Sequence, residues 1–380
     1  MNPEVVRVGS EELEEWRQVV SWVYARQAPE PDAYPLEAGE HRFLARVGGR
    51  PAGACTVYDY TVARGQSDLR MGGVAGVATL PEFRRSGVAD SLMRNVLAAM
   101  RDDGFAVSAL YGYREPFYRK FGYETCGWRY QIKCPQGRFP RVTSELPIKQ
   151  IDVSGLAVLE PVYEAFIRSR SGSPMRTEED WKHRMGKRAP MVYQVGEPAE
   201  GYLWVHLEDF WGDVNVGEVA WSTRAGYEGC LSLMGSLCSN QSSVTWNEPP
   251  DSPFLSRYLD QGITATVSRA TMYRIVDVPR ALSSLTAIDE VEFSMRVEDS
   301  QCPWNAGHWR VNAGPKGTSV VSGGDPDFEI EVGALTQAIM GQPSLSALAM
   351  QGVVKVNRPE ALMAVSRAFS PLPVVCMEFF

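Results

Sequence analysis

Apolar residues form two kinds of pattern along the first 140 residues. Spacing of three to four positions predicts amphipathic helices at 11–26 and at 88–100. Shorter apolar runs predict strands at 5–8, 41–47, 51–60, 71–79, 107–111 and 128–133. Gly48-Gly49 is a hairpin turn signal between two of these strands, and a short helix is expected at 116–121. The mixture predicts a domain in which helices and strands are combined.

A second part of the chain has the same order of elements in fainter form. Residues 134–140 are rich in Gly and Pro and are expected to form a linker. Thr177, with Asp180 three residues on, predicts a helix start. The remaining expected elements are helices at 158–168 and 228–237, a hairpin of 191–195 with 201–207, and a strand at 214–222.

The last hundred residues predict a third, different unit. A strand is expected at 291–297, and glycine-rich turns follow it. Helices are expected at 332–340 and 359–368, the second with a proline in its first turn. The chain closes on the apolar stretch 374–380, which is expected to be tucked into the protein.

Composition narrows the function classes. The 380 residues are 44% apolar, and the net charge of −8 argues against nucleic acid binding through a basic surface. It is compatible with a cationic substrate. Seven cysteines without a C-x-x-C pair and four scattered histidines favour neither a disulfide framework nor a zinc site. Without a secretion signal or an apolar run of about 20 residues, we expect a cytoplasmic protein with no membrane partner and no metal.

The most informative stretch joins the strand at 71–79 to the helix at 88–100. A helix N-terminus offers free backbone N–H groups and a dipole that favours a diphosphate. Gly87 has no Cβ, which lets the backbone approach a ligand, and Arg84 and Arg85 add positive charge. An ordinary basic loop could carry the same residues, but the place between strand and helix favours a phosphate site.

This stretch resembles the acetyl-CoA signature R/Q-x-x-G-x-G/A of the GNAT acetyltransferase superfamily at its three fixed positions, Arg84, Gly87 and Ala89. The resemblance implies that the preceding strand splays open and binds the thioester and pantetheine through its backbone. Gly76 is consistent with a bulge in that strand. The implied cofactor-binding residues are Val77, Ala78, Thr79, Arg84, Arg85, Ser86, Gly87, Val88, Ala89, Asp90, Tyr113 and Arg114.

Residues 115–123 resemble a second GNAT signature, F-Y-x-x-x-G-F/Y. The resemblance implies that Tyr118 protonates the departing thiolate. A phenol with a pKa near 10 can protonate a thiolate whose acid has a pKa of about 8.5, provided that the two lie within hydrogen-bond reach. Tyr123 is the competing candidate, and a purely structural role for Tyr118 in the core is the alternative.

The whole chain resembles a narrower group, the enhanced intracellular survival (Eis) acetyltransferases. The resemblance lies in residues 273–282, in 302–310 (Cys-Pro-Trp-Asn-Ala-Gly-His-Trp-Arg) and in the ending 371–380. It implies a mixed α+β fold with tandem GNAT domains, the second degenerate, and a sterol carrier protein-like domain. The expected domains are 1–140 (catalytic, acetyl-CoA-binding), 141–278 (degenerate) and 279–380 (supplying the chain's end). Residues 221–229 lack the cofactor turn, so one acetyl-CoA site per chain is expected.

In the Eis family the catalytic base is the α-carboxylate of the last residue, which here is Phe380. A terminal carboxylate has an ordinary pKa of about 3.5 and can accept a proton from an ammonium substrate. Alternatively, the terminal phenylalanines plug an apolar groove. The resemblance also implies a hexamer and acetylation of small-molecule amines, with aminoglycosides or other polyamine-type compounds as candidate acceptors. Three other functions stay open: transfer of a different acyl group or to a protein acceptor, a non-catalytic binding protein, and a lipid carrier.

Overall fold

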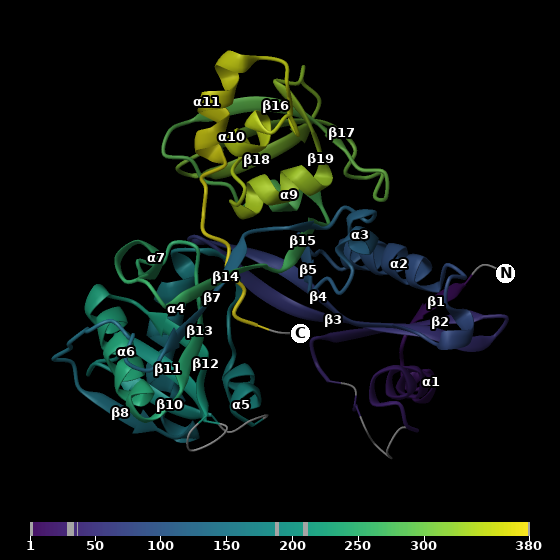
Figure 1. Ribbon diagram of the computed structural model, residues 1–380. Helices are drawn as coiled ribbons and strands as arrows, with labels where there is room; N and C mark the ends of the chain where they lie inside the picture. The colour runs from purple at the N-terminus through teal and green to yellow at the C-terminus, as the bar shows by residue number, and fades with distance from the viewer. Residues whose placement is uncertain (1–2, 29–33, 36, 187–189, 208–211, 379–380) are drawn as a thin grey trace.

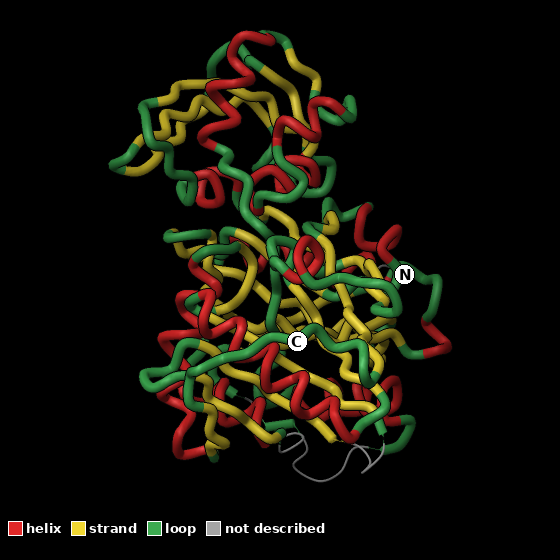
Figure 2. The backbone as a smooth tube through the Cα atoms, turned by 60° about the vertical axis from the view of Figure 1, so that its left-hand side comes forward, coloured by secondary structure: helices red, strands yellow, loops and turns green. Residues whose placement is uncertain are grey.

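A computed structural model describes residues 3–28, 34–35, 37–186, 190–207 and 212–378. Three β-sheets, of eight, seven and five strands, form three lobes (Figure 1). The first and second lobes lie side by side and the third lies above them, connected to them by a narrower region that Figure 2 shows from another side. The predicted mixture of helices and strands is therefore confirmed.

The first lobe is built on a sheet of order β1-β2-β3-β4-β5-β15-β6, with β9 also paired to β3. Its strands are β1 Glu4–Arg7, β2 Glu40–Val47, β3 Arg50–Arg64, β4 Ser67–Thr79, β5 Val107–Leu110, β6 Glu124–Thr125, β9 Ser171–Pro174 and β15 Met272–Ile275. Its helices are α1 Leu13–Val20, α2 Val88–Asp102 and α3 Glu115–Arg119, with a π-helical turn at Ser21–Ala25 and a 3₁₀ turn at Pro81–Phe83. The apolar face of α2 closes one side of this sheet.

The second lobe has the sheet order β14-β7-β13-β12-β11-β10-β8. Its strands are β7 Trp128–Pro135, β8 Ile148–Ile151, β10 Met191–Val195, β11 Gly201–Leu207, β12 Asp213–Trp221, β13 Ser243–Glu248 and β14 Thr264–Arg269. Its helices are α4 Glu160–Arg168, α5 Glu178–Gly186, α6 Arg224–Leu237 and α7 Phe254–Arg257, with 3₁₀ turns at Val153–Leu159 and Cys238–Asn240. Separate apolar clusters pack against α6 and against α4, so the sheet lies between two helical layers.

The two large sheets exchange strands. β7 follows the first lobe in sequence but pairs with β13 and β14 of the second, and β15 returns from the second lobe to pair with β5 and β6 of the first. Because β7 comes before residue 140 and β15 before residue 278, sheet membership does not follow those two limits. The domain limits themselves stay a prediction.

The third lobe contains α8 Val278–Leu282, β16 Val291–Glu298, β17 Gly307–Gly314, β18 Gly317–Ser322, β19 Phe328–Glu331, α9 Val332–Met340, α10 Leu345–Met350, β20 Lys355–Val356 and α11 Pro359–Ala368. Its core continues into the first lobe, since one apolar cluster includes residues of β4, β5, β15 and α9. Buried Arg274 of β15 forms an ion pair with buried Asp299 at 2.9 Å. The third lobe is thus joined to the first by apolar packing and by a buried ion pair.

Most predicted elements are present, with small shifts at their ends. Thr177 and Asp180 form the expected reciprocal cap, with both backbone N–H groups bonded at 2.8 and 3.1 Å. The predicted linker at 134–140 is partly wrong, because β7 continues to Pro135 along β13. Helix α6 begins at Arg224 rather than at 228, because Thr223 caps it. Among the described residues, no helix has the length and apolar character needed to cross a bilayer.

Candidate active site

Strands β4 and β5 diverge and form a wedge in the first lobe. They pair in parallel for three residues, from Met71 opposite Val107 to Gly73 opposite Ala109. Beyond this point β4 continues to Thr79 along β3, while β5 ends one residue later. Beyond Gly73, the backbone groups on this edge of β4 therefore have no ladder partner in β5.

A bulge marks the free part of β4. The register with β3 shifts between Ala54 and Thr56, so that Cys55 alone lies opposite two residues, Gly76 and Val77. Gly76 has a φ of 60°, in the left-handed region that glycine adopts without strain. The predicted bulge is confirmed. It turns the backbone at Val77 relative to a regular strand, immediately before the cofactor turn.

The turn after β4 ends in an uncapped helix. Arg85 and Gly87 have φ values of 64° and 84°, and the first intrahelical bond of α2 runs from the Ser91 N–H to the Gly87 carbonyl at 2.9 Å. No side chain in the described part of the protein caps this N-terminus. The first three N–H groups of α2 thus have no intrahelical acceptor, and they point with the helix dipole out of the turn. This geometry suits an anion.

The polar and charged side chains around the turn leave the N-terminus of α2 open. Arg84 and Arg85 are exposed, and neither has an ion-pair partner among the described residues. The Ser86 hydroxyl donates to the Phe83 carbonyl at 2.6 Å, which closes the loop on itself. Asp90, the one acidic residue of the first turn, forms an ion pair with Lys120 beside α3. The turn is therefore net positive.

Tyr118 of α3 lies beside the bulge. Burial, followed by the neighbouring Tyr24 and Cys55, raises the pKa of its hydroxyl to about 12. The Tyr24 hydroxyl in turn donates to the Val77 carbonyl at 3.2 Å. No hydrogen bond of the Tyr118 hydroxyl is found within the described part of the chain. The fold thus brings the candidate acid together with the bulged strand.

The other predicted residues are placed differently. Tyr123 is fully buried, and its hydroxyl shares a 2.8 Å hydrogen bond with Ser108 inside the core, which suits a structural aromatic. Tyr113 is 94% exposed and Arg114 is exposed beside it, so the structure does not bring these two into the wedge. The buried side chains of Ala78 and Val88 leave only their backbone for a ligand. Half-buried Thr79 and Ala89 border the turn.

The tail after α11 returns to the first lobe. Val374 forms a parallel bridge to Ser171 of β9, with hydrogen bonds of 3.0 and 2.8 Å on either side. At Glu378 the main-chain carbonyl accepts a hydrogen bond from Tyr111, the residue that follows β5. The tail therefore reaches the mouth of the β4–β5 wedge. Phe380, the predicted base, lies outside the described residues.

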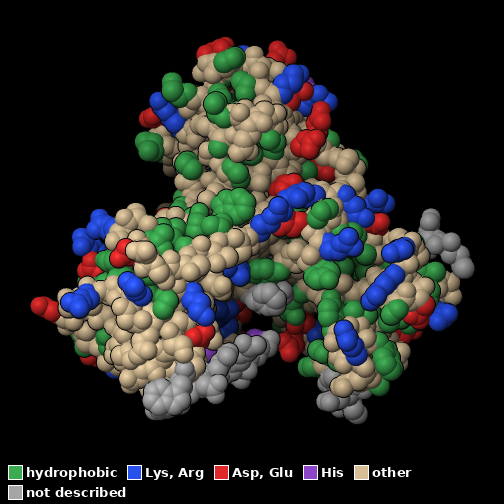
Figure 3. Space-filling model, viewed as in Figure 1, with side chains coloured by type: hydrophobic (Ala, Val, Ile, Leu, Met, Phe, Trp, Pro, Cys, Tyr) green, Lys and Arg blue, Asp and Glu red, His purple; other side chains and the backbone are tan. Residues whose placement is uncertain are grey.

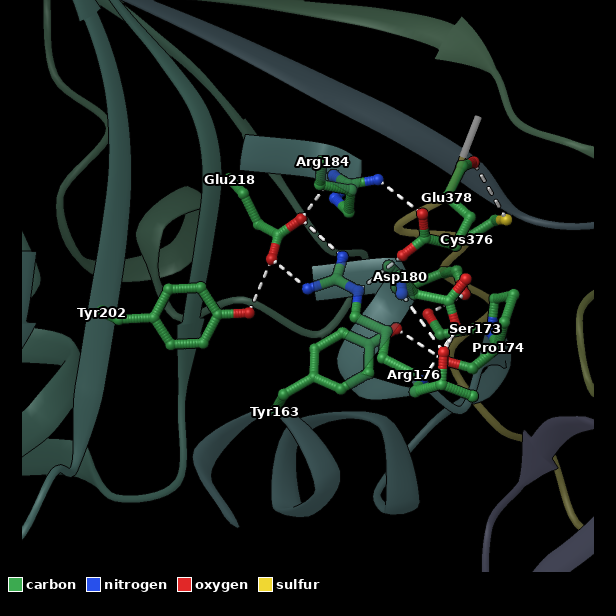
Figure 4. A network of polar contacts seen from close by, with 12 residues as sticks. Tyr163, Ser173, Pro174, Arg176, Asp180, Arg184, Tyr202, Glu218, Cys376 and Glu378 are labelled. Atoms are coloured by element: carbon green, nitrogen blue, oxygen red, sulfur yellow. Dashed lines mark hydrogen bonds and ion pairs between the residues drawn. The ribbon is translucent and has the colours of Figure 1, made fainter. Parts of the chain in front are cut away.

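Sequence reasoning missed a buried cluster of charges beside the tail (Figure 4). Arg176 contacts Glu218 at 2.7 Å and Glu378 at 2.6 Å, and Arg184 contacts the same two carboxylates at 2.6 Å each. Burial favours the neutral acid at Glu218, but both guanidinium groups outweigh it and hold the pKa at about 2. No local spacing signals this cluster, because its members come from α5, β12, the segment before α5 and the tail.

A cavity of about 240 Å³ lies next to this cluster, between the tail and the second lobe. It is lined by residues of β12, by the end of β13 and by residues 374–378. Burial raises the pKa of Glu248 at its wall to about 7, against hydrogen bonds that lower it. Figure 3 shows that the molecular surface is hollowed between the first and second lobes.

The matching turn of the second lobe is closed. Thr223 caps α6 by accepting a hydrogen bond from the Gly226 N–H at 3.0 Å, and its hydroxyl donates to the Glu200 carboxylate. A diphosphate there would meet a negative charge and an occupied helix N-terminus. This supports the expectation of one acetyl-CoA site per chain. No cluster of three potential metal ligands occurs among the described residues.

Three family models match the chain in succession. Residues 4–126 and 172–275 match acetyltransferase (GNAT) domains, and residues 278–377 match a sterol carrier protein domain. An uncharacterized N-acetyltransferase from Streptomyces avermitilis is 25% identical over 96% of this chain and 91% of its own length. Another from Streptomyces coelicolor is 26% identical over 80% and 79%.

Solved structures share the complete fold. A probable N-acyltransferase from Enterococcus faecalis superposes with a TM-score of 0.89 at 20% identity, and both chains are fully covered. Eis1 from Mycobacterium abscessus superposes with a TM-score of 0.80 at 22% identity, again over both full chains. The expected fold class and the resemblance on which it rests are confirmed. The chain is a GNAT N-acetyltransferase with the Eis-like order of two GNAT domains and a sterol carrier protein domain.

Proposed function

We propose that the protein transfers an acetyl group from acetyl-CoA to an amine of a small molecule in the β4–β5 wedge of its first lobe. The observation that carries this proposal is the continuity of bulge, turn and uncapped α2, with Tyr118 beside them. Divergent strands expose backbone groups to a thioester arm, and the helix N-terminus accepts a diphosphate. In the second lobe the matching turn is capped by Thr223.

For the cofactor, we propose that the diphosphate lies at residues 84–90 and that the pantetheine arm follows Val77, Ala78 and Thr79. Two arginines without an ion-pair partner among the described residues and three N–H groups without an intrahelical acceptor support the first assignment, since each interacts favourably with an anion. The bulge supports the second, because it turns backbone groups toward the wedge. Tyr113 and Arg114 are assigned to the cofactor only by resemblance.

Tyr118 acts as the acid in this proposal. With a pKa raised to about 12, its hydroxyl keeps its proton at every working pH. Burial likewise raises the pKa of the neighbouring Cys55 thiol. A thiolate released beside these residues would be destabilised in the same direction, which favours its protonation by Tyr118.

The carboxylate of Phe380 is the proposed base. The hydrogen bond from Tyr111 to the Glu378 carbonyl supports it, because that contact brings the tail to the mouth of the wedge two residues before position 380. A carboxylate there would take a proton from the ammonium form of the substrate before the nitrogen attacks the thioester carbon. The electrons of the broken carbon–sulfur bond leave with the thiolate, which Tyr118 protonates.

Acceptors of this site are proposed to be cationic small molecules, including aminoglycosides and other polyamine-type compounds. The net charge of −8 supports a positively charged acceptor. We further propose a homo-oligomer, a hexamer by resemblance, in the cytoplasm. Light scattering on the purified protein measures the mass; a monomer would refute that part alone.

A thiol-release assay tests the proposed function. The protein is mixed with acetyl-CoA and, separately, kanamycin-type aminoglycosides, linear polyamines and peptides with a free N-terminus. We expect thiol release with small-molecule amines and loss of most of it in Tyr118→Phe. A matched control, Tyr193→Phe, removes a tyrosine hydroxyl of β10 in the second lobe, where it contacts the Met191 sulfur at 3.8 Å, and tests whether the loss of any tyrosine hydroxyl lowers turnover. Release with peptides alone, or with a longer acyl donor alone, would contradict the proposal.

A further inference from the structure

We propose that the second lobe acts as the holder of the chain's tail, and that Arg176, Arg184 and Glu218 are positioning residues for the end of the chain. This inference rests on the proposed function, since it concerns where the carboxylate of Phe380 lies. It gives the second GNAT domain, which lacks a cofactor turn, a part in the reaction of the first.

The second lobe has a wedge of its own. β12 and β13 pair in parallel for three residues, Asp213–Asn215 with Ser243–Thr245, and then diverge, as β4 and β5 do. Beyond the divergence, the opening is bordered by Glu218 on one side and Glu248 on the other. The tail residues 374–378 line the same opening. The β12–β13 wedge corresponds to the β4–β5 wedge, to which we assign the thioester arm, but here the protein's own tail borders it.

The tail is held in this place by two independent sets of contacts. Backbone hydrogen bonds on either side of Val374, together with the Ser173 hydroxyl donating to the Val375 carbonyl at 2.8 Å, attach the first part to β9. Val375 and Met377 pack against the apolar cluster under α4. These contacts do not involve the Glu378 side chain, so losing its charge leaves the first part of the tail attached.

The second set is the charged clamp on Glu378. Both of its carboxylate oxygens are bonded, one to Arg176 and one to Arg184, each at 2.6 Å. The same two guanidinium groups also form ion pairs with Glu218, which in addition accepts a 2.6 Å hydrogen bond from Tyr202. Figure 4 shows Arg176 lying between the two carboxylates. The geometry holds the Glu378 side chain from two directions.

Charge explains why this clamp is specific for the tail. Side chains of Arg176 and Glu218 are 1% exposed, and those of Glu378 and Arg184 are 11% and 21% exposed. Two positive and two negative charges balance only when Glu378 is in place. Without it the buried guanidinium groups have one carboxylate between them, which is costly in a low-dielectric site. The second lobe is thus complementary to an acidic tail at this position.

The clamp lies within reach of the chemistry. Two residues span at most about 7 Å between Cα atoms, so fixing Glu378 limits how far the Cα atom of residue 380, and the carboxylate attached to it, can lie from the clamp. The Tyr111 hydroxyl, on the Glu378 carbonyl, ties the same residue to the end of β5 in the first lobe. Glu378 is therefore held between the two lobes, and its clamp sets the direction in which the chain's end leaves.

The test compares three variants in the full-length protein, with acetyl-CoA and an amine that the wild type acetylates. Glu378→Gln keeps the shape and removes the charge, and Tyr111→Phe removes the hydrogen bond from the other side. Glu329→Gln is the matched control: an ion-paired carboxylate of the third lobe, partnered by Lys355 and Arg296. Calorimetric acetyl-CoA affinity and melting temperature show whether each variant is folded.

We expect kcat to fall about 10- to 100-fold in Glu378→Gln and less in Tyr111→Phe, since displacing a reacting group by about 1 Å can cost 10²-fold. Acetyl-CoA affinity should be unchanged. The kcat of Glu378→Gln should also rise more steeply with pH than that of the wild type. At high pH the substrate amine is already unprotonated, so its reaction no longer depends on the base. A purely structural role would not change that slope.

Two outcomes overturn the inference. Wild-type kcat and pH profile in a folded Glu378→Gln would show that the clamp does not position the base, and an equal loss in Glu329→Gln would show a general effect of losing an ion pair. Failure of the proposed function is distinguishable, because then the wild type itself would release no thiol with any amine.

Discussion

Replacing Gly87 with glutamate places a carboxylate in the turn that we assign to the diphosphate. An added Cβ at Gly87 meets no atom within 4 Å, so the protein itself has room for the side chain. The backbone is less tolerant, because a φ of 84° costs an L-residue about 1–2 kcal/mol. Gly87→Ala carries the same backbone cost without a charge and is therefore the matched control.

Because glutamate also adds bulk that alanine lacks, the salt-dependent part of the difference between these two variants measures the electrostatic effect. Two unit charges 4 Å apart repel by about 1 kcal/mol in water and about 4 kcal/mol at an effective dielectric constant of 20. The turn is exposed, so the effect lies between these limits, which correspond to roughly 5-fold and 700-fold in affinity. Because a diphosphate carries more than one charge, the lower figure is a minimum.

Isothermal titration calorimetry with CoA at two salt concentrations measures the CoA affinity of the wild type and of each variant. We expect Gly87→Ala to bind somewhat more weakly than the wild type and Gly87→Glu to bind far more weakly still. The gap between the variants should narrow as salt rises, because exposed charges are screened. Equal CoA affinity in Gly87→Glu and Gly87→Ala would refute the placement of the diphosphate at this turn.

Four further outcomes are expected. Tyr118→Phe should lower kcat about 10²- to 10⁴-fold in the thiol-release assay, with acetyl-CoA affinity unchanged by calorimetry; an unchanged kcat would remove Tyr118 as the acid. A few residues added after Phe380 should lower turnover while sparing CoA binding, and full turnover would argue against a terminal base. Calorimetry should give one CoA per chain, whereas two would show that the turn at Thr223 also binds. Finally, burial raises the pKa of Glu248 in the folded state to about 7 from an ordinary value of 4.5, so the folded state keeps this proton to a higher pH than the unfolded state. The free energy of unfolding should therefore fall by about 1.4 kcal/mol per pH unit as the pH rises between these two values. Denaturant titrations should show a flatter slope in Glu248→Gln.

Local pattern predicted those parts of the fold that are decided by neighbours in sequence. The hairpin at Gly48-Gly49, the cap at Thr177 and the helices at 332–340 and 359–368 all follow from residues a few positions apart. The bulge before the turn could be anticipated from Gly76 for the same reason. Each depends on turn chemistry or helical spacing, which the sequence displays directly.

Long-range pairing could not be predicted in this way. The sequence predicts β7 as an ordinary strand and does not predict β15, and nothing in the apolar pattern says that each pairs in the other lobe's sheet. The clamp is a further case. Arg176 and Glu378 are 202 positions apart, and an arginine or glutamate at either position is most simply a solvated charge until the fold buries both. The tail's path depends on this burial.

The central claim is that one wedge, between β4 and β5, holds the thioester with its sulfur beside Tyr118 and the chain's end. A crystal structure of the protein with CoA and an amine tests it most directly. We predict the diphosphate on the N–H groups of α2, the sulfur within hydrogen-bond distance of the Tyr118 hydroxyl, and the carboxylate of Phe380 facing the amine. CoA in the wedge of the second lobe, or a chain end directed away from the sulfur, would contradict the account.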